Sequence, residues 1–240
     1  MKEQITAYWT KRSDTFSKLR KQELNSYMAN LWLKEIKPYL SKHRPYKILD
    51  VGTGSGFFAI LLAKAGHFVE GIDLTESMIE QAKILAHSEN LAGKVNFQVM
   101  DAENLAFASE SFDMVITRNL TWTLPNPQKA YSEWYRVLKL NGVLLNFDAD
   151  YGKQKFSNDA SLPISHVHNL VQKSLMEECD SIKNNLMISK MNRPTWDVKV
   201  LNKLGYSNIF ADTQIGKRLY THKDNFYNPA PVFLISAVKN

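Results

Sequence analysis

The chain has 240 residues, of which 44% are hydrophobic and 22% are charged, with a formal net charge of +6 at neutral pH. This composition excludes an intrinsically disordered chain, and no apolar run approaches the length of a membrane-spanning helix. The one cysteine, Cys179, excludes an internal disulfide framework, and the N-terminus has no apolar signal sequence, so we expect a cytoplasmic protein that folds as a single domain over residues 1–240.

An amphipathic helix is predicted for residues 13–37, because apolar side chains recur near one face with Lys and Arg between them. Ser13 is its expected N-cap. Tyr8 and Trp9 stand in the short polar segment that precedes it. We interpret this aromatic pair either as a packing anchor or as part of a lid over a ligand, within an N-terminal helical lead of residues 1–44.

Strands and helices alternate in the next part of the chain, residues 45–150. Strands are predicted at residues 46–51, 68–73, 95–100, 112–118 and 143–147, the last of them after a turn at Asn141-Gly142. Helices are predicted at residues 57–65, 76–88 and 127–137, and Asn126 and Pro127 form the start of the third. Strands separated by helices of this length predict βαβ units and a parallel sheet.

The alternation stops after Asp150. Residues 151–194 are polar and contain one predicted helix, from about residue 165 to 190, but no clear strand. The segment 195–240 is predicted to hold a helix at 195–204 and two antiparallel strands at 207–212 and 232–238. We interpret residues 151–194 as a cap that covers the substrate, because an insertion at this point lies near the carboxyl ends of the strands, where open α/β sheets bind ligands.

The stretch ILDVGTGSG at residues 48–56 predicts a strand, a tight turn and the start of a helix. Glycine permits the positive φ that such a turn needs, and the helix N-terminus offers free N–H donors to a ligand. A dinucleotide site would have the spacing G-x-G-x-x-G, whereas this chain has G-x-G-x-G after an acid, Asp50. A carboxylate there repels a diphosphate and suits a ligand with positive charge, such as a sulfonium amino acid.

Five segments together resemble the motifs of class I S-adenosylmethionine-dependent methyltransferases of the type 11 group. They are Asp50–Gly56, similar to motif I, Gly71–Met78, similar to the second motif, Met100–Leu105, similar to the adenine-side segment, and Ser111–Val115 with Arg136–Gly142, similar to the fourth and fifth strand regions. The resemblance implies a Rossmann-like, seven-stranded, mostly parallel sheet with an antiparallel last strand, an N-terminal helix and a helical cap insertion. Asn141 stands where the family often has proline, a difference that concerns a turn and not the site.

The resemblance also implies that S-adenosylmethionine is the cofactor and S-adenosylhomocysteine the product. It places Asp73 at both ribose hydroxyls, Asp101 at the adenine amine with the Ala102 N–H on the ring, and Leu74 and Met78 on the adenine faces. The backbone of the glycine turn would lie against the amino-acid part. The predicted cofactor-binding residues are Tyr8, Trp9, Asp50, Gly52, Thr53, Gly54, Gly56, Asp73, Leu74, Met78, Asp101, Ala102, Glu103, Arg118 and Asn119.

The end of the fourth predicted strand indicates the acceptor. Residues 118–125 lack the Asn/Asp-Pro-Pro-aromatic tetrad with which DNA-modifying members hold an amine, so DNA is not the expected partner. The predicted substrate residues are Trp122, Tyr151, His166 and His168, and Asp148 joins the last three as a candidate base. No metal is predicted, because His166 and His168 would face apart on a helix. No catalytic residue is assigned.

The predicted function is methyl transfer to an O, N or S nucleophile of a small molecule, with no membrane partner. An anionic group on that acceptor is expected, because residues 1–47 and 151–240 are net basic around a net acidic middle. Three alternatives stay open at this stage. They are an RNA methyltransferase, which the basic flanks favour, a protein that binds the methyl donor without transfer, and an NAD-dependent oxidoreductase.

Overall fold

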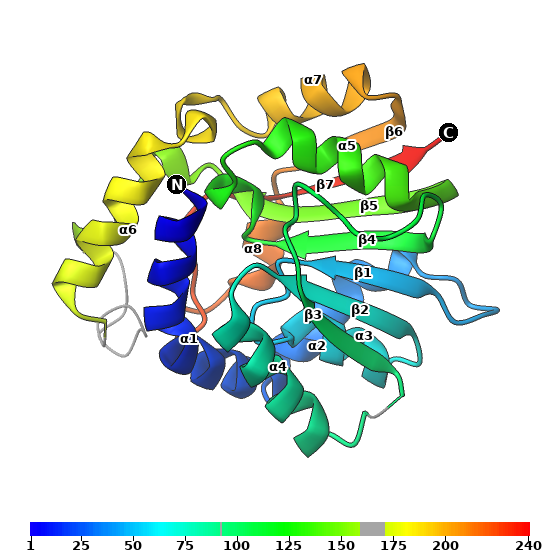
Figure 1. The fold of residues 1–240 in the computed structure, drawn as a ribbon, viewed down its shortest axis with the longest axis horizontal. Coiled ribbons are helices and arrows are strands. Elements are labelled where there is room, and N and C mark those ends of the chain that lie inside the picture. Colours follow the sequence, from blue (N-terminus) through cyan, green and yellow to red (C-terminus); the bar gives the residue numbers. More distant parts are fainter. Residues whose placement is uncertain (92, 159–170) are drawn as a thin grey trace.

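The computed structural model of the chain describes residues 1–91, 93–158 and 171–240. In this part of the chain, seven strands form one sheet in the order β3-β2-β1-β4-β5-β7-β6 (Figure 1). The strands are β1 (Lys47–Val51), β2 (Phe68–Asp73), β3 (Val95–Val99), β4 (Phe112–Arg118), β5 (Leu138–Ala149), β6 (Tyr206–Asp212) and β7 (Val232–Lys239). The pairs among β1 to β5 are parallel, and β7 runs antiparallel to both β5 and β6. The predicted fold class is therefore confirmed.

Helices cover both faces of the sheet (Figure 1). The α-helices are α1 (Lys2–Leu24), α2 (Tyr27–Ile36), α3 (Phe57–Lys64), α4 (Glu76–Ser88), α5 (Pro127–Val137), α6 (Lys173–Asn185), α7 (Thr195–Lys203) and α8 (Ile215–Leu219). The 3-10 turns are η1 (Lys37–Tyr39), η2 (Thr121–Thr123), η3 (Tyr151–Lys153), η4 (Phe156–Asn158) and η6 (Met187–Lys190). None of the helices in residues 1–91, 93–158 and 171–240 combines the length and apolarity needed to cross a bilayer.

The sheet is buried on both faces because apolar side chains fill successive positions of its strands. Ile48 and Leu49 are both fully buried, yet Ile48 packs with α2 and α3 while Leu49 packs with α5 and α7. Successive residues of a strand point to opposite faces, so neighbouring apolar residues serve two separate cores. The central strands consequently hold their carboxyl ends in fixed positions relative to one another.

The N-terminal helix differs from the prediction. The chain forms two helices, and α1 already begins at Lys2, so Tyr8 and Trp9 lie within a helix and Ser13 is not a cap. The break comes at Asn25, and Ser26 caps α2 by accepting a hydrogen bond from the Met28 N–H at 3.1 Å. The predicted single helix over residues 13–37 is wrong because Ser26 supplies an N-cap in its middle.

Most other predicted elements agree with the structure to within one or two residues. The helices at α4 and α5 have the predicted bounds, and the Asn126 side chain accepts from the Lys129 N–H as an N-cap should. The strand β5 begins earlier than predicted and runs through Asn141, whose φ of 61° marks an irregularity in its pairing with β4. The helix predicted from 165 to 190 is observed over a shorter range as α6, because the backbone turns extended at Leu186 and continues as η6; residues 165–170 of that prediction lie outside the described residues. The short helix α8 was not predicted.

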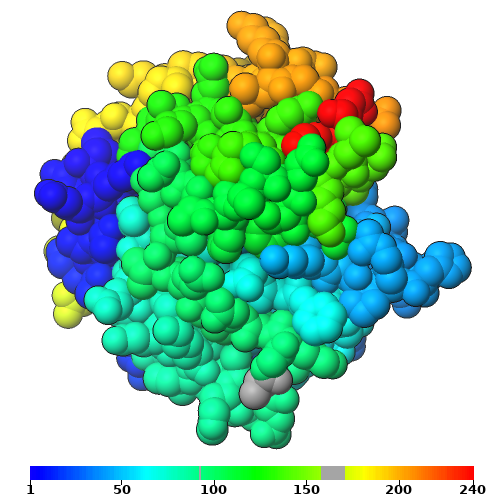
Figure 2. Space-filling view, turned by 45° about the vertical axis from the view of Figure 1, so that its right-hand side comes forward, coloured from blue at the N-terminus to red at the C-terminus, as the bar shows by residue number. Residues whose placement is uncertain are grey.

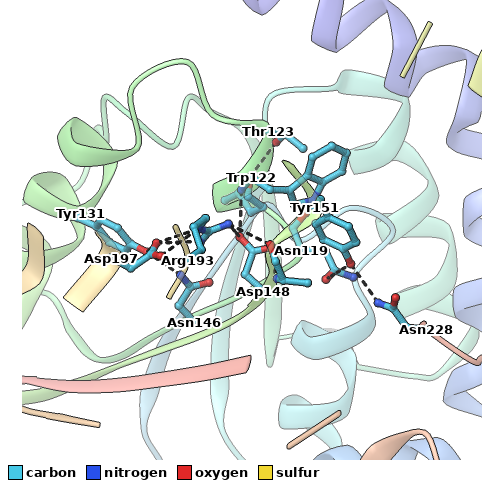
Figure 3. Close-up of polar contacts among 12 residues, drawn as sticks. Asn119, Trp122, Thr123, Tyr131, Asn146, Asp148, Tyr151, Arg193, Asp197 and Asn228 are labelled. Carbon is cyan, nitrogen blue, oxygen red and sulfur yellow. Dashed lines mark hydrogen bonds and ion pairs between the residues drawn. The ribbon is translucent and has the colours of Figure 1, made fainter. Parts of the chain in front are cut away.

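A buried charge network joins the sheet to the segment that precedes α7 (Figure 3). The Arg193 guanidinium donates to Asp148 Oδ2 on β5 at 2.9 Å and to Asp197 Oδ1 on α7 at 2.8 Å. The Tyr131 hydroxyl of α5 donates to the same Asp197 oxygen at 2.7 Å. Asp148 also accepts a hydrogen bond from the Trp122 N–H at 3.0 Å, so one carboxylate binds both Arg193 and the turn η2.

We expect Arg193→Met to destabilise the protein by about 3–5 kcal/mol, because the substitution leaves Asp148 and Asp197 buried without their counter-charge. Urea unfolding followed by circular dichroism measures the loss. Lys199→Met, which changes an exposed lysine on the same segment, is the matched control and should alter the free energy of unfolding by less than about 0.5 kcal/mol. Equal stabilities of the two variants would contradict the assignment of the network as the link between β5 and α7.

Candidate functional site

A cavity of about 230 Å³ lies at the carboxyl ends of the parallel strands, underneath α1. The sheet side of its wall comes from the turn after β1, the end of β2 and the segment after β4. The opposite side comes from α1, from the cap segments around η3, η4 and α6, and from residues 225–229 before β7. The cavity therefore lies where the sequence predicted a ligand site, between the sheet and the 151–194 insertion.

Three glycines of the turn adopt left-handed backbone conformations, and two of them form the floor of the cavity. The φ angles are 67° at Gly52, 53° at Gly54 and 88° at Gly56, a region that other residues rarely occupy. A Cβ on Gly52 would lie 2.7 Å from the Leu120 side chain, so the turn also needs glycine for space. Gly56 lies below the turn and does not line the cavity. The predicted strand-turn-helix thus exposes backbone to a ligand at Gly52 and Gly54.

Two carboxylates hold this turn from below. Asp50 is 2% exposed and accepts from the Thr53 hydroxyl at 2.6 Å and from the Ala59 N–H at 3.0 Å. Burial raises the pKa of Asp50 to about 7. Asp73 accepts from the Gly54 N–H at 3.0 Å through one oxygen and from the Thr75 N–H at 2.9 Å through the other. Burial raises the pKa of Asp73 as well. A cation or hydrogen-bond donors in the cavity would therefore stabilise the ionised form of both acids.

The start of α1 is bound to the far edge of the cavity. Lys2 Nζ lies 2.7 Å from Asp101 Oδ2 and 2.6 Å from Glu103 Oε2. Asp101 lines the cavity with Ala102, Leu74 and Met78, whereas Glu103 is buried beside it and accepts from the Asn126 N–H. The structure thus brings the predicted adenine-side residues together, and it places Lys2 across them.

Arg118 belongs to a buried cluster at the other end of the cavity. Its guanidinium lies 2.8 Å from Glu23 Oε1 and stacks with its Cζ 4.2 Å from the centroid of the Trp32 ring. Glu23 also pairs with Arg20 and accepts from the Trp32 indole N–H at 2.9 Å. Two guanidinium groups share one carboxylate, which leaves a surplus positive charge beside the glycine turn. Of these three residues, only Arg118 was predicted from the sequence.

Aromatic side chains form the end of the cavity below the cap. The Trp122 ring centroid lies 4.9 Å from that of Tyr151 and 5.5 Å from that of Phe156. The Tyr151 hydroxyl donates to Asn119 Oδ1 at 3.0 Å and accepts from the Asn228 amide at 3.0 Å (Figure 3). These bonds fix the ring, and burial raises the pKa of the Tyr151 phenol. The hydroxyl is therefore a structural contact and is not poised as a base.

The other candidate bases are not placed in the described cavity. Asp148 is fully buried behind Trp122 and paired with Arg193, so it does not line the cavity. His166 and His168 lie outside the described residues, so the prediction that they bind no metal stays a prediction. Within the described part of the chain, no group of three or more His, Cys, Asp or Glu side chains could hold a metal ion.

One face of α1 supplies most of the lining that the sequence did not reveal. The lining residues absent from the prediction include Ile5, Arg12, Phe16, Leu19, Arg20, Phe57, Phe58, Met176, Cys179, Tyr220 and residues 225–229. The α1 members and Tyr8 recur every three or four residues, which is the signal that could have identified them. Tyr8 is 5% exposed and packs in the main core while it lines the cavity, so both interpretations of the aromatic pair remain compatible with its position.

Comparison with known proteins agrees with this geometry. Residues 49–146 match the family described as the methyltransferase domain. A demethylmenaquinone methyltransferase from Bacteroides fragilis is 34% identical over 119 residues, which make up 48% of this chain and 47% of that protein. The chain spans about half the length of the curated relatives it matches.

Two solved structures cover most of this chain. Phosphoethanolamine N-methyltransferase 2 from Haemonchus contortus, in complex with phosphomonomethylethanolamine and S-adenosylhomocysteine, is 20% identical with a TM-score of 0.63 and covers 88% of this chain and 52% of that one. The cyclase SpnF is 18% identical with a TM-score of 0.58 and covers 87% and 80%. At these identities the likeness shows the fold alone, and together with the domain match it confirms the predicted resemblance.

Asp50 gives the ligand-free protein a characteristic pH dependence. Its folded-state pKa of about 7 lies above the ordinary value of 3.8, so between these pH values the native state binds more protons than the unfolded state. Stability is therefore expected to fall as pH rises from about 4 to 7, by at most about 4 kcal/mol. Asp50→Asn keeps an oxygen for Thr53 and Ala59, and should remove most of this fall while raising stability at pH 8.

Urea unfolding at pH 5 and pH 8 measures the effect. Asp14→Asn, an exposed aspartate on α1, is the matched control and should retain the wild-type pH dependence. If Asp50→Asn lost as much stability between the two pH values as the wild type, the carboxyl of Asp50 would not be the group responsible.

Proposed function

We propose that the protein is an S-adenosylmethionine-dependent methyltransferase that acts on an O, N or S nucleophile of a small molecule, and the match of residues 49–146 to the methyltransferase-domain family supports this proposal. The observation that carries the proposal is that the turn residues Gly52 and Gly54 line the cavity together with the buried Asp50 and the half-buried Asp73. This arrangement lets a ligand approach the backbone closely and offers it negative charge, as a sulfonium nucleoside requires.

The cofactor is S-adenosylmethionine, and the cavity residues fit its parts in order. Each oxygen of Asp73 accepts one backbone hydrogen bond and retains acceptor capacity for a ribose hydroxyl. Leu74, Met78 and Ala102 supply an apolar slot for the adenine, with Asp101 at its rim. Because Lys2 already pairs with Asp101, the adenine amine would share that carboxylate with Lys2.

The amino-acid end of the donor would lie at the opposite end of the cavity. Its ammonium group would favour the ionised form of Asp50, whose pKa burial now raises to about 7. Its carboxylate would face the surplus positive charge that Arg20 and Arg118 retain after sharing Glu23. Charge complementarity therefore orients the donor along the cavity, from Asp101 to Arg118.

The sulfonium supplies an activated methyl group, so the tasks of the chain are alignment and exclusion of water, an orientation effect that can contribute about 7–11 kcal/mol. α1 lies over the donor end, since the Phe16 ring lies 3.1 Å from the position that a Cβ on Gly54 would take. The cap segment 151–194, for which we propose the substrate-binding role, contributes Tyr151, Phe156 and Met176 to the wall.

A small acceptor fits this enclosure better than RNA. On the face drawn in the space-filling view, the blue N-terminal helix adjoins the cyan and green segments (Figure 2). Three basic residues of α1 are also engaged within the molecule, because Lys2 pairs with Asp101, Lys11 with Glu178 and Arg20 with Glu23. These three are therefore not free for a nucleic acid backbone, which requires an extended basic surface.

A second candidate function is binding of the donor without methyl transfer. The cyclase SpnF has this fold, and neither Asp148 nor Tyr151, the two candidate bases among the described residues, is positioned as a base. The two functions are separated by incubating the protein with S-adenosylmethionine labelled on the methyl group and a metabolite extract. Transfer of label to an extract component supports the methyltransferase, whereas donor binding without any transfer supports the second candidate.

Asp73→Ala should weaken S-adenosylhomocysteine binding by about tenfold to a hundredfold, since hydrogen bonds to a charged acceptor are worth about 1.5–3 kcal/mol. Isothermal titration calorimetry measures the change, with circular dichroism to verify folding. Asp14→Ala, at an exposed site away from the cavity, should bind as the wild type does. Wild-type affinity in a folded Asp73→Ala variant would refute the ribose assignment.

A further inference from the structure

Arg12 is a cation inside the cavity for which the described residues supply no carboxylate partner. It lies on α1, is 4% exposed and lines the cavity wall. Its Nη1 lies 3.9 Å from the sulfur of Met176, and its Nε has no hydrogen-bond partner. Among the described residues, no carboxylate lies within 4.0 Å of its guanidinium. The three other cations that line the cavity, Lys2, Arg20 and Arg118, all have carboxylate partners.

A buried guanidinium without a counter-ion is strongly unfavourable, and arginine cannot lose its charge by deprotonation. The molecule tolerates such a group where a ligand supplies the missing anion. The planar fork of arginine matches a carboxylate through two parallel hydrogen bonds. An anionic group on a bound ligand is therefore the expected partner of Arg12.

The contacts of Arg12 place it on the acceptor side of the cavity. Lys2 marks the Asp101 end of α1, and Arg20 marks the Arg118 end, so the donor already has charged partners at both ends. Arg12 instead faces α6 of the cap through Met176. Its partner is therefore on the molecule that lies under the cap, and not on the methyl donor.

The aromatic side chains that line the cavity below the cap indicate the chemical nature of the rest of the ligand. The rings of Trp122, Tyr151 and Phe156 are in mutual contact, with Tyr151 to Phe156 at 5.6 Å between centroids. The hydroxyl of Tyr151 is bonded to Asn119 and Asn228, so the ring presents its apolar surface. Aromatic walls with one fixed charged group form a site for a flat apolar skeleton that carries a single acid group.

We propose that Arg12 binds the carboxylate of an aromatic acid whose ring lies against Trp122, Tyr151 and Phe156, and that this acid is the methyl acceptor. The identity of the acid as acceptor rests on the proposed methyltransferase function. Its binding does not, and can be measured with no reaction taking place.

The test uses matched acids and amides with the protein saturated in S-adenosylhomocysteine. The probes are 4-hydroxybenzoate, 4-aminobenzoate and 4-mercaptobenzoate, which offer O, N and S nucleophiles, each against its carboxamide. We expect at least one acid to bind tenfold or more tightly than its amide to the wild type, and Arg12→Gln to abolish that preference. Arg12→Lys should keep part of it, and Lys11→Gln, on the neighbouring exposed lysine, should keep all of it.

Equal binding of acids and amides to the wild type, absence of binding by every acid, or a preference that survives in Arg12→Gln would overturn the proposal. Tighter binding of phenyl phosphate than of any acid would assign the anion to a phosphate ester and would likewise overturn it. Should Arg12→Gln fail to fold, the comparison of acid with amide in the wild type decides alone. Failure of S-adenosylhomocysteine to bind, with the acid preference intact, would refute the proposed function and leave this site standing.

Discussion

The turn between β1 and α3 depends on two carboxylates, the buried Asp50 and the half-buried Asp73, and the rest of the site depends on that turn. Asp50 fixes it from within through Thr53 and Ala59, while Asp73 reaches across from β2 to the Gly54 N–H. Parallel pairing of β1 with β2 sets the two acids at one edge of the sheet. Burial disfavours the ionised form of both acids when no ligand is bound. A cationic donor in the cavity would stabilise that form and would be bound more tightly for it.

On the α1 side of the cavity the charges are positive, and they too exceed the opposite charge that the protein supplies. Glu23 of α1 neutralises only one of the two guanidinium groups that meet it, those of Arg20 and Arg118. Arg12, two turns earlier on the same helix, has no carboxylate partner among the described residues. α1 is thus both a cover and a source of positive charge, and its removal would change the electrostatics of the cavity as well as its access.

The alternating core could be predicted because each of its signals is local. Asn126 and Pro127 mark a helix start within three residues, and the glycines after Asp50 mark a turn that the structure contains. The pairing of Glu23 with Arg118 joins residues 95 positions apart, and no local pattern encodes such a distance. The prediction also missed the start of α1 at Lys2, and for a related reason, since the face of α1 that lines the cavity includes Arg12 and Arg20 and is therefore not uniformly apolar.

The position of α1 along the cavity accounts for part of the basic character of the N-terminal segment. A cluster of lysines and arginines in a sequence is ordinarily a solvated face or a surface for nucleic acid. On α1 the residues divide by helical position, because Lys18 and Lys21 are exposed while Arg12 is buried. Residues 12, 16 and 20 recur every four positions along the cavity side. Part of the positive charge of this segment is therefore directed inward, where a low dielectric makes each charge more selective for an anion than it would be on the surface.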